Sequence, residues 1–193
     1  MLKILALGDS LTAGYGLAPE YSFASRLEKA LKHEGRKVEV INAGISGDTT
    51  HDGVMRIKGL LRHRPDLVII QFGANDLYAG LSAEQVRTNL MRMIDMSRSQ
   101  GAAVLVAGIL CLISPDDPLS TSLHRAFKQA ASSCQVPLLE DFMPEIPGNP
   151  DLTLPDGIHP NERGVDKMVK NTLPLLLPIL DGLMSRSSPG SEG

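Results

Sequence analysis

The sequence predicts an α/β fold of three layers, in which a parallel sheet of five strands lies between two layers of helices. Two observations favour this fold. Short apolar runs alternate with segments of helical period along most of the chain. The third run, 67–72, is apolar nearly throughout, as is typical of a central parallel strand that is buried on both faces. We therefore expect one domain over residues 1–184, followed by a disordered tail over residues 185–193.

Each predicted element has a local signal. The strand-like runs are 2–7, 38–41, 67–72, 102–110 and 136–139. Between them, apolar residues recur at helical spacing, and Gly35, Pro65 and Gly101 mark the ends of the first three helices. Ser82 and Gln85 have the spacing of a capping box at the start of the third helix. A fourth helix follows, over the segment that precedes the fifth strand.

The last third of the chain is predicted to begin with a loop. The segment 142–155 contains four prolines and is expected to be irregular, and long loops of this kind are usually functional. A final helix is predicted to start at Asn161. The apolar stretch 173–180 is interrupted by Pro174 and Pro178 and is too short to span a bilayer, so we expect no stable membrane insertion.

Composition narrows the function classes. The formal net charge is −3 and the basic residues are scattered, which gives no reason to expect a nucleic-acid partner. The first residues form a strand and not an export signal, so the sequence as written predicts a cytoplasmic protein. Removal of an export signal would instead imply a periplasmic or secreted one. Cys111 and Cys134 are expected to be buried free thiols. The oligomeric state is left open.

The turn after the first strand is the first candidate for chemistry. Residues 8–11 read GDSL, which places Ser10 at the carboxyl end of a parallel strand, where open α/β sheets bind ligands. Taken alone, a serine at this place is more often a helix cap. Asp9 is interpreted as a turn residue.

A base and a carboxylate occur far downstream. Asp156 and His159 are three residues apart on one turn, so both can approach one serine from the same side. A serine hydroxyl needs such a base, and the base needs a carboxylate to hold its tautomer. Most other histidines lie in helices or at their ends. His51, at the start of a helix, has no obvious loop serine.

Acyl transfer also needs hydrogen-bond donors for the developing oxyanion. Gly47, in the loop after the second strand, can offer a backbone N–H, and Asn75, after the third strand, can offer its side-chain amide. Each residue has a simpler explanation, as a turn glycine and as a strand-end residue that closes its own turn. Together with Ser10 they form the donor set that a hydrolase requires.

Four blocks carry a resemblance to a known family. Residues 8–11, 45–49, 73–76 and 156–160 resemble, in order and spacing, the signature blocks of the GDSL or SGNH hydrolases. They are most similar to the branch of bacterial arylesterases and multifunctional thioesterase/lysophospholipases. The resemblance implies a flavodoxin-like fold and no metal or organic cofactor.

The resemblance also implies a role for each candidate residue. Ser10 would be the nucleophile, His159 the base and Asp156 its orienting partner. The N–H groups of Ser10 and Gly47 and the side chain of Asn75 would form the oxyanion hole. The expected activity is that of a serine esterase on small-molecule acyl esters, either short-chain or aryl esters, with thioesters and lysophospholipids as further candidates.

The substrate pocket is predicted less closely. Leu77, Tyr78, Leu112 and Ile113 could line an apolar pocket, but their loops differ from those of the branch, so a preference for acyl chain length cannot be carried over. One alternative is a carbohydrate acetylesterase, against which the three tyrosines and absent tryptophan argue mildly. Another is a non-enzymatic flavodoxin-like domain that binds a small ligand, although the glycine patterns of phosphate-binding loops are absent.

Overall fold

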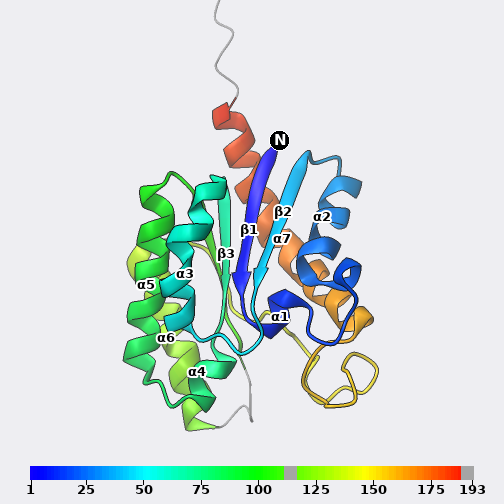
Figure 1. Ribbon diagram of the computed structural model, residues 1–193, viewed down its shortest axis with the longest axis vertical. Helices are drawn as coiled ribbons and strands as arrows, with labels where there is room; N and C mark the ends of the chain where they lie inside the picture. The colour runs from blue at the N-terminus through cyan, green and yellow to red at the C-terminus, as the bar shows by residue number, and fades with distance from the viewer. Residues whose placement is uncertain (111–116, 188–193) are drawn as a thin grey trace, which may run out of the picture.

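The computed structural model of the chain describes residues 1–110 and 117–187, and its centre is a parallel sheet (Figure 1). The five strands are adjacent in the order β2-β1-β3-β4-β5. Their bounds are Leu2–Gly8 for β1, Val38–Gly44 for β2, Leu67–Gln71 for β3, Ala103–Ala107 for β4 and Leu138–Leu139 for β5. All pairings are parallel, which confirms the predicted fold class. The strand β5 is shorter than the predicted run 136–139.

Helices cover both faces of this sheet. On one face lie α2 (Phe23–His33) and α7 (Glu162–Ser187), and on the other α3 (Thr50–Leu60), α5 (Ala83–Ser99) and α6 (Pro118–Cys134). Alternate residues of each strand point to opposite faces. In β1, Leu5 and Leu7 pack in the core beneath α3 and α5, whereas Ile4 packs in the core beneath α2 and α7.

The helix starts follow the polar residues of the sequence. The predicted capping box is present, because the Ser82 side chain accepts from the backbone of Gln85 while the Gln85 side chain accepts from the backbone of Ser82. A second capping box joins Thr49 and Asp52 at the start of α3. Each box satisfies backbone N–H groups that have no partner inside the helix.

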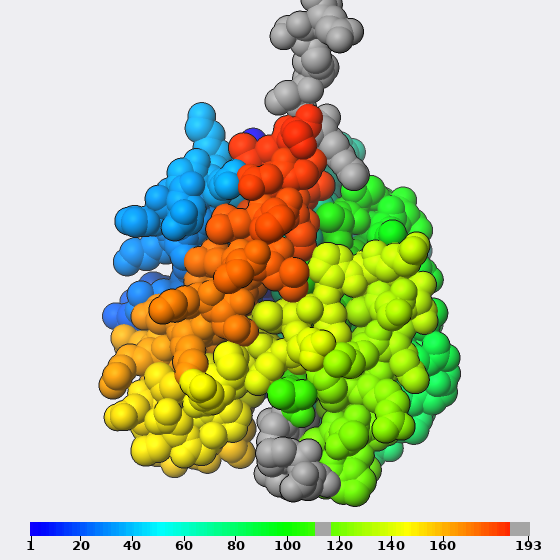
Figure 2. All heavy atoms as spheres, turned by 180° about the vertical axis from the view of Figure 1, so that it is seen from behind, coloured from blue at the N-terminus to red at the C-terminus, as the bar shows by residue number. Residues whose placement is uncertain are grey.

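The last helix is longer than expected. It continues through Pro174 and Pro178 to Ser187, so residues 185–187, predicted to begin a disordered tail, are helical. Each proline removes one helical hydrogen bond, but Leu176 and Leu180 are fully buried, and this packing holds the helix on the sheet. Figure 2 shows α7, in orange and red, lying obliquely across the face of the sheet that it covers together with α2. In the parts of the chain that the structure describes, no helix is long and apolar enough to cross a membrane.

Two short helices and one loop shape the end of the sheet where the strands finish. The sequence did not predict α1 (Ser10–Ala13) or α4 (Ala74–Tyr78) as helices. The loop before α7 is irregular, as predicted, and contains one isolated antiparallel bridge between Thr153 and Pro160. Short 3₁₀ turns occur at Pro19–Tyr21 (η1) and Leu61–His63 (η2). Cys134 is a buried free thiol, whereas Cys111 lies outside the described residues.

Candidate active site

Ser10 is the first residue of α1, directly after β1. The cap of this helix is Asp9, whose side chain accepts the backbone N–H of Leu11 at 3.0 Å, so Ser10 is not needed as a cap. Gly8 allows the tight turn, because a Cβ atom there would lie 2.1 Å from Oγ1 of Thr12. The interpretation of Asp9 as a simple turn residue is therefore incomplete, since its side chain is fully buried and forms the cap.

The burial of Asp9 has an electrostatic consequence. Removal from water disfavours the charged carboxylate and raises the pKa of Asp9 to about 7, even though the N–H of Leu11 acts in the opposite direction. The carboxyl groups of Asp76 and Asp48 raise this pKa further. A carboxyl group that titrates near neutrality thus lies next to Ser10 in the chain.

Asp156, His159 and Ser10 form a connected line of polar atoms. Nε2 of His159 lies 3.1 Å from Oγ of Ser10, and Nδ1 of His159 lies 2.7 Å from Oδ2 of Asp156. The structure thus brings together two segments that are 149 residues apart. Burial alone would raise the pKa of Asp156, but hydrogen bonds from Ile158 N–H, from the His159 ring and from His159 N–H lower it below its ordinary value. Asp156 is therefore held in its ionised form.

The loop before α7 is folded so that it presents Asp156 and His159 toward the sheet edge. Two parts of this loop are joined by the bridge between Thr153 and Pro160. The N–H of Leu154 also donates to the carbonyl of His159 at 2.7 Å. The backbone around the histidine is therefore fixed by main-chain hydrogen bonds.

Tyr15 is a residue at the site that the sequence analysis did not single out. Its ring centroid lies 4.4 Å from that of His159, with the planes inclined by 38°, and its side chain is half exposed. Such contacts restrain the orientation of an imidazole ring. The only signal in the sequence was its place five residues after Ser10.

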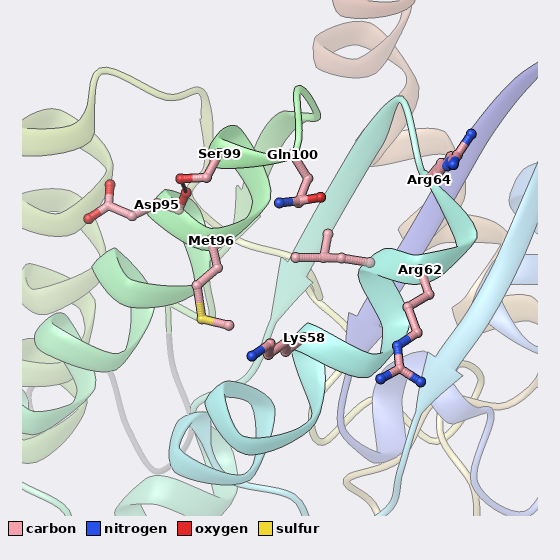
Figure 3. A pocket seen from close by; sticks show the side chains of 8 residues that line it. Lys58, Arg62, Arg64, Asp95, Met96, Ser99 and Gln100 are labelled. Atoms are coloured by element: carbon pink, nitrogen blue, oxygen red, sulfur yellow. Dashed lines mark hydrogen bonds between the residues drawn. The ribbon is translucent and has the colours of Figure 1, made fainter.

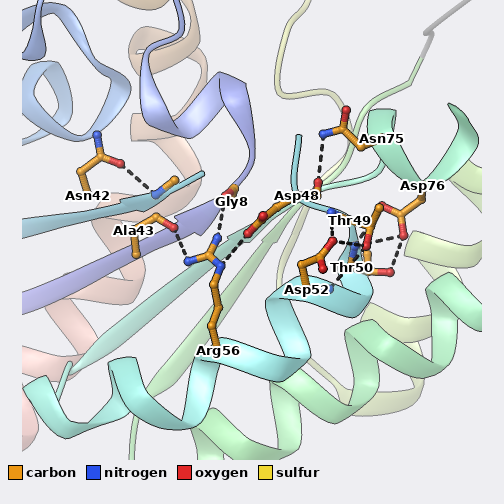
Figure 4. A network of polar contacts seen from close by, with 11 residues as sticks. Gly8, Asn42, Ala43, Asp48, Thr49, Thr50, Asp52, Arg56, Asn75 and Asp76 are labelled. Atoms are coloured by element: carbon orange, nitrogen blue, oxygen red, sulfur yellow. Dashed lines mark hydrogen bonds and ion pairs between the residues drawn. The ribbon is translucent and has the colours of Figure 1, made fainter. Parts of the chain in front are cut away.

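Gly47 and Asn75 follow β2 and β3, the two strands on either side of β1. Gly47 is exposed with φ of +93°, a conformation that glycine adopts without strain. Nδ2 of Asn75, on α4, donates to the carbonyl of Asp48 at 2.9 Å (Figure 4). This bond uses one of the two amide hydrogens and ties Asn75 to the loop that contains Gly47.

A buried network of hydrogen bonds holds Thr50, which directly follows the loop that contains Gly47. The carboxylate of Asp76 accepts the backbone N–H of Thr50 at 3.0 Å and also accepts the Thr50 hydroxyl. Asn89 of α5 donates to that hydroxyl oxygen at 3.0 Å. Burial raises the pKa of Asp76, while the hydrogen bonds from Thr50 oppose the shift. The first turn of α3 is thereby joined to α4 (Figure 4). Through Asn89 it is also joined to α5.

The residues predicted to line a substrate pocket are only partly described. Leu77 is half-buried and Tyr78 is 73% exposed, both on α4 next to Asn75. Leu112 and Ile113 lie outside the described residues. His51, which had no assigned partner, is exposed on α3 and lines a cavity of about 440 Å³ together with residues such as Glu84.

A second cavity, with a volume of about 810 Å³, is drawn in Figure 3. Among the side chains that line it are Lys58, Met96 and Gln100. Gln100 and the lining residue Arg64 precede β4 and β3, so the cavity lies at the amino ends of the strands. Ligands of open α/β sheets bind at the opposite, carboxyl edge, which is where Ser10 lies. Among the described residues, no group of three or more His, Cys, Asp or Glu side chains could hold a metal ion.

The chain is similar to several known proteins in its sequence and in its fold. Residues 6–167 match the model of the GDSL-like lipase/acylhydrolase family. The chain is 38% identical over 159 residues to an arylesterase of Vibrio mimicus, which covers 82% of this chain and 80% of the relative. It is 31% identical over 178 residues to thioesterase 1/protease 1/lysophospholipase L1 of Escherichia coli K12, which covers 90% and 84%. The solved structure of the psychrotrophic esterase EstA from Pseudoalteromonas sp., inhibited by monoethylphosphonate, matches with a TM-score of 0.85 at 29% identity, over 93% of this chain and 98% of that chain.

Proposed function

The chain belongs to the GDSL-like lipase/acylhydrolase family and is a carboxylic ester hydrolase, and on this premise we propose that Ser10 is the nucleophile of its reaction. The observation that carries the proposal is the pair of distances at His159, 3.1 Å to Ser10 and 2.7 Å to Asp156. A nucleophile, a base and an orienting carboxylate are arranged in the order that acyl transfer requires.

The first half of the reaction forms an acyl-enzyme. Asp156 accepts the hydrogen on Nδ1 of His159, which leaves Nε2 unprotonated and able to take the proton of the Ser10 hydroxyl. Oγ of Ser10 then bonds to the acyl carbon. His159 returns the proton to the departing alcohol or thiol as its bond to the acyl carbon breaks.

The oxyanion of this step is proposed to bind three donors. These are the backbone N–H groups of Ser10 and Gly47 and the second amide hydrogen of Asn75. They come from the ends of three adjacent strands, β2, β1 and β3, so they converge on one edge of the sheet. In the second half of the reaction, His159 removes a proton from water, whose oxygen bonds to the acyl carbon. His159 then returns this proton to Oγ of Ser10 as the bond between Oγ and the acyl carbon breaks and the acid is released.

We propose small acyl esters, with short acyl chains or aryl leaving groups, as the substrates. The relative in Vibrio mimicus is named an arylesterase, and that in Escherichia coli is also named a thioesterase and lysophospholipase. Leu77 and Tyr78 on α4 offer apolar surface beside Asn75. A carbohydrate acetylesterase is a second hypothesis, against which the three tyrosines and the absence of tryptophan argue mildly. The hypothesis of a non-enzymatic binding domain is set aside because the chain belongs to a family of acylhydrolases.

Hydrolysis of short p-nitrophenyl esters tests the role of Ser10. We expect the purified protein to be active and Ser10→Ala to be nearly inactive, and an alkylphosphonate to label the protein at Ser10. Ser99→Ala is the matched control, because Ser99 lies on an exposed part of α5. Full activity of Ser10→Ala, or labelling at another residue, contradicts the proposed mechanism.

A series of esters and thioesters of increasing acyl length tests the substrate class. We expect kcat/KM to be highest for the short or aryl esters and to fall as the acyl chain lengthens. A maximum at long acyl chains, or activity restricted to acetylated sugars, contradicts the proposed substrate while leaving the role of Ser10 intact.

A further inference from the structure

Arg56 of α3 contacts three different segments at the site edge of the sheet. Its Nε atom lies 2.6 Å from Oδ2 of Asp48, Nη1 donates to the carbonyl of Ala43 at 2.6 Å, and Nη2 donates to the carbonyl of Gly8 at 2.9 Å (Figure 4). One guanidinium group therefore joins the end of β1, the end of β2 and the loop that follows β2.

These three points are next to the residues proposed to act on the substrate. Gly8 precedes the turn that presents Ser10, and its carbonyl also accepts the N–H of Ile45 at 3.0 Å. Asp48 follows Gly47, and its backbone carbonyl accepts from Asn75 at 2.9 Å. A continuous line of contacts thus runs from Arg56 through Asp48 to Asn75, with a branch to the turn of Ser10.

The environment makes these contacts strong. The Arg56 and Asp48 side chains are only 19% and 15% exposed, so water screens their charges less than those of a surface pair. The guanidinium also lies 6.0 Å from the ring centroid of Phe72. Its planar fork can address three acceptors at once, whereas the single ammonium group of a lysine cannot reproduce this geometry.

We propose that Arg56 is a positioning residue that sets the distance between the nucleophile and the oxyanion donors. The inference rests on the proposed function, because it assumes the roles of Ser10, Gly47 and Asn75. Arg56 does not touch the substrate. It binds both the carbonyl of Gly8 and the carboxylate of Asp48, and thereby holds the Gly47 loop against the turn of Ser10.

Kinetics of Arg56→Ala test this role. Displacement of oxyanion donors lowers the rate of the chemical step, so we expect kcat to fall by about tenfold to a hundredfold, with KM changed by less than about threefold. Arg56→Lys should fall between Arg56→Ala and the natural protein. Arg87→Ala is the matched control, since Arg87 is an arginine on the outer surface of α5 paired with Glu84, and its kcat should not change.

A double-mutant cycle separates positioning from a general loss of structure. If Arg56 acts in part through Asp48 and Asn75, then Arg56→Ala should lower kcat by a clearly smaller factor in a protein that already carries Asn75→Ala than in the natural protein. If Arg56 only stabilises the fold, the two effects on kcat should multiply. Millimolar guanidinium should also restore part of the kcat of Arg56→Ala, but should not activate Arg87→Ala or the natural protein.

The outcomes distinguish this inference from the proposed function. An Arg56→Ala protein with natural kcat, or effects that multiply with those of Asn75→Ala, overturns the inference even when Ser10→Ala is inactive. Where Arg56→Ala does not fold, Asp48→Asn replaces it, because that change removes the carboxylate and keeps the backbone carbonyl that binds Asn75. We then expect a fall in kcat of about tenfold for Asp48→Asn, and an unchanged kcat overturns the inference.

Discussion

Asp156 holds His159 by two different atoms: Oδ1 accepts the backbone N–H of His159 at 2.9 Å, and Oδ2 lies 2.7 Å from Nδ1 of its ring. The carboxylate therefore fixes both the main chain and the ring of the same residue. In a loop without regular secondary structure, this double attachment places Nε2 toward Ser10.

The Asp156→Asn variant should keep the hydrogen bond to the backbone N–H of His159, but the His159 ring should lose the tautomer that the reaction needs. An amide N–H directed at Nδ1 would leave the hydrogen on Nε2, which then cannot accept the Ser10 proton, so we expect kcat to fall by about 10³ to 10⁴. Ester hydrolysis under saturating substrate measures the effect. Asp151→Asn, in an exposed part of the same loop, should retain kcat. Comparable activity of the two variants would exclude Asp156 from the mechanism.

Asn75→Ala should remove one oxyanion donor. We expect kcat to fall by about a hundredfold or more, with a smaller change in KM, because the interaction strengthens in the transition state. Asn171→Ala is the control. Asn171 lies on α7, and its side chain makes a similar hydrogen bond to a backbone carbonyl, that of Asp141. Both proteins should give the same circular dichroism spectrum as the natural chain. An unchanged kcat for Asn75→Ala removes this residue from the site.

Asp9 should make the stability of the fold depend on pH. Burial raises the pKa of Asp9 from 3.8 to about 7, so between these values the folded protein binds a proton that the unfolded chain releases. Its contribution to the free energy of unfolding is therefore greatest below about pH 4, falls as the pH rises and becomes level above about pH 7. Asp9→Asn removes this contribution and cannot ionise.

Urea denaturation across that window measures the difference. The free energy of unfolding of the natural protein should fall, relative to that of Asp9→Asn, as the pH increases from about 4 to about 7. Parallel pH profiles for the two proteins would show that Asp9 does not titrate in this range.

Gly8→Ala should destabilise the protein. The added Cβ would lie 2.1 Å from Oγ1 of Thr12 and 2.7 Å from the carbonyl oxygen of Gln71, so the turn must shift, at about 2–3 kcal/mol in the free energy of unfolding. Gly59→Ala, in α3, has no atom within 4 Å of the new Cβ and should stabilise by about 0.5–1 kcal/mol. Denaturant midpoints compare the two variants, and equal midpoints would contradict the tight turn.

The secondary structure was predictable where the sequence showed a clear local pattern, such as an apolar run or a capping box. The apolar run of β3 and the capping box of Ser82 and Gln85 appear in the structure as expected. The helix α4 was missed because five residues are too few to show a helical period. The end of α7 was misplaced because its prolines and polar last residues resemble a tail, and only the packing of residues such as Leu180 on the sheet holds that helix.

The features of the candidate site also fall into two groups, those that the sequence determined and those that only the tertiary structure decided. By itself the sequence determined the family, the fold class and the candidates Ser10, Gly47, Asn75, Asp156 and His159, because motif blocks and strand ends are local features, and the ends of parallel strands share one edge. Only the tertiary structure decided the contacts of Tyr15 and Arg56 and the burial of Asp9. Arg56 meets Gly8 across 48 residues of sequence, and the Thr50 backbone meets Asp76 across 26. Periodicity tells which face of an element is buried, whereas such pairings depend on the order of the strands and on which side chains then face one another.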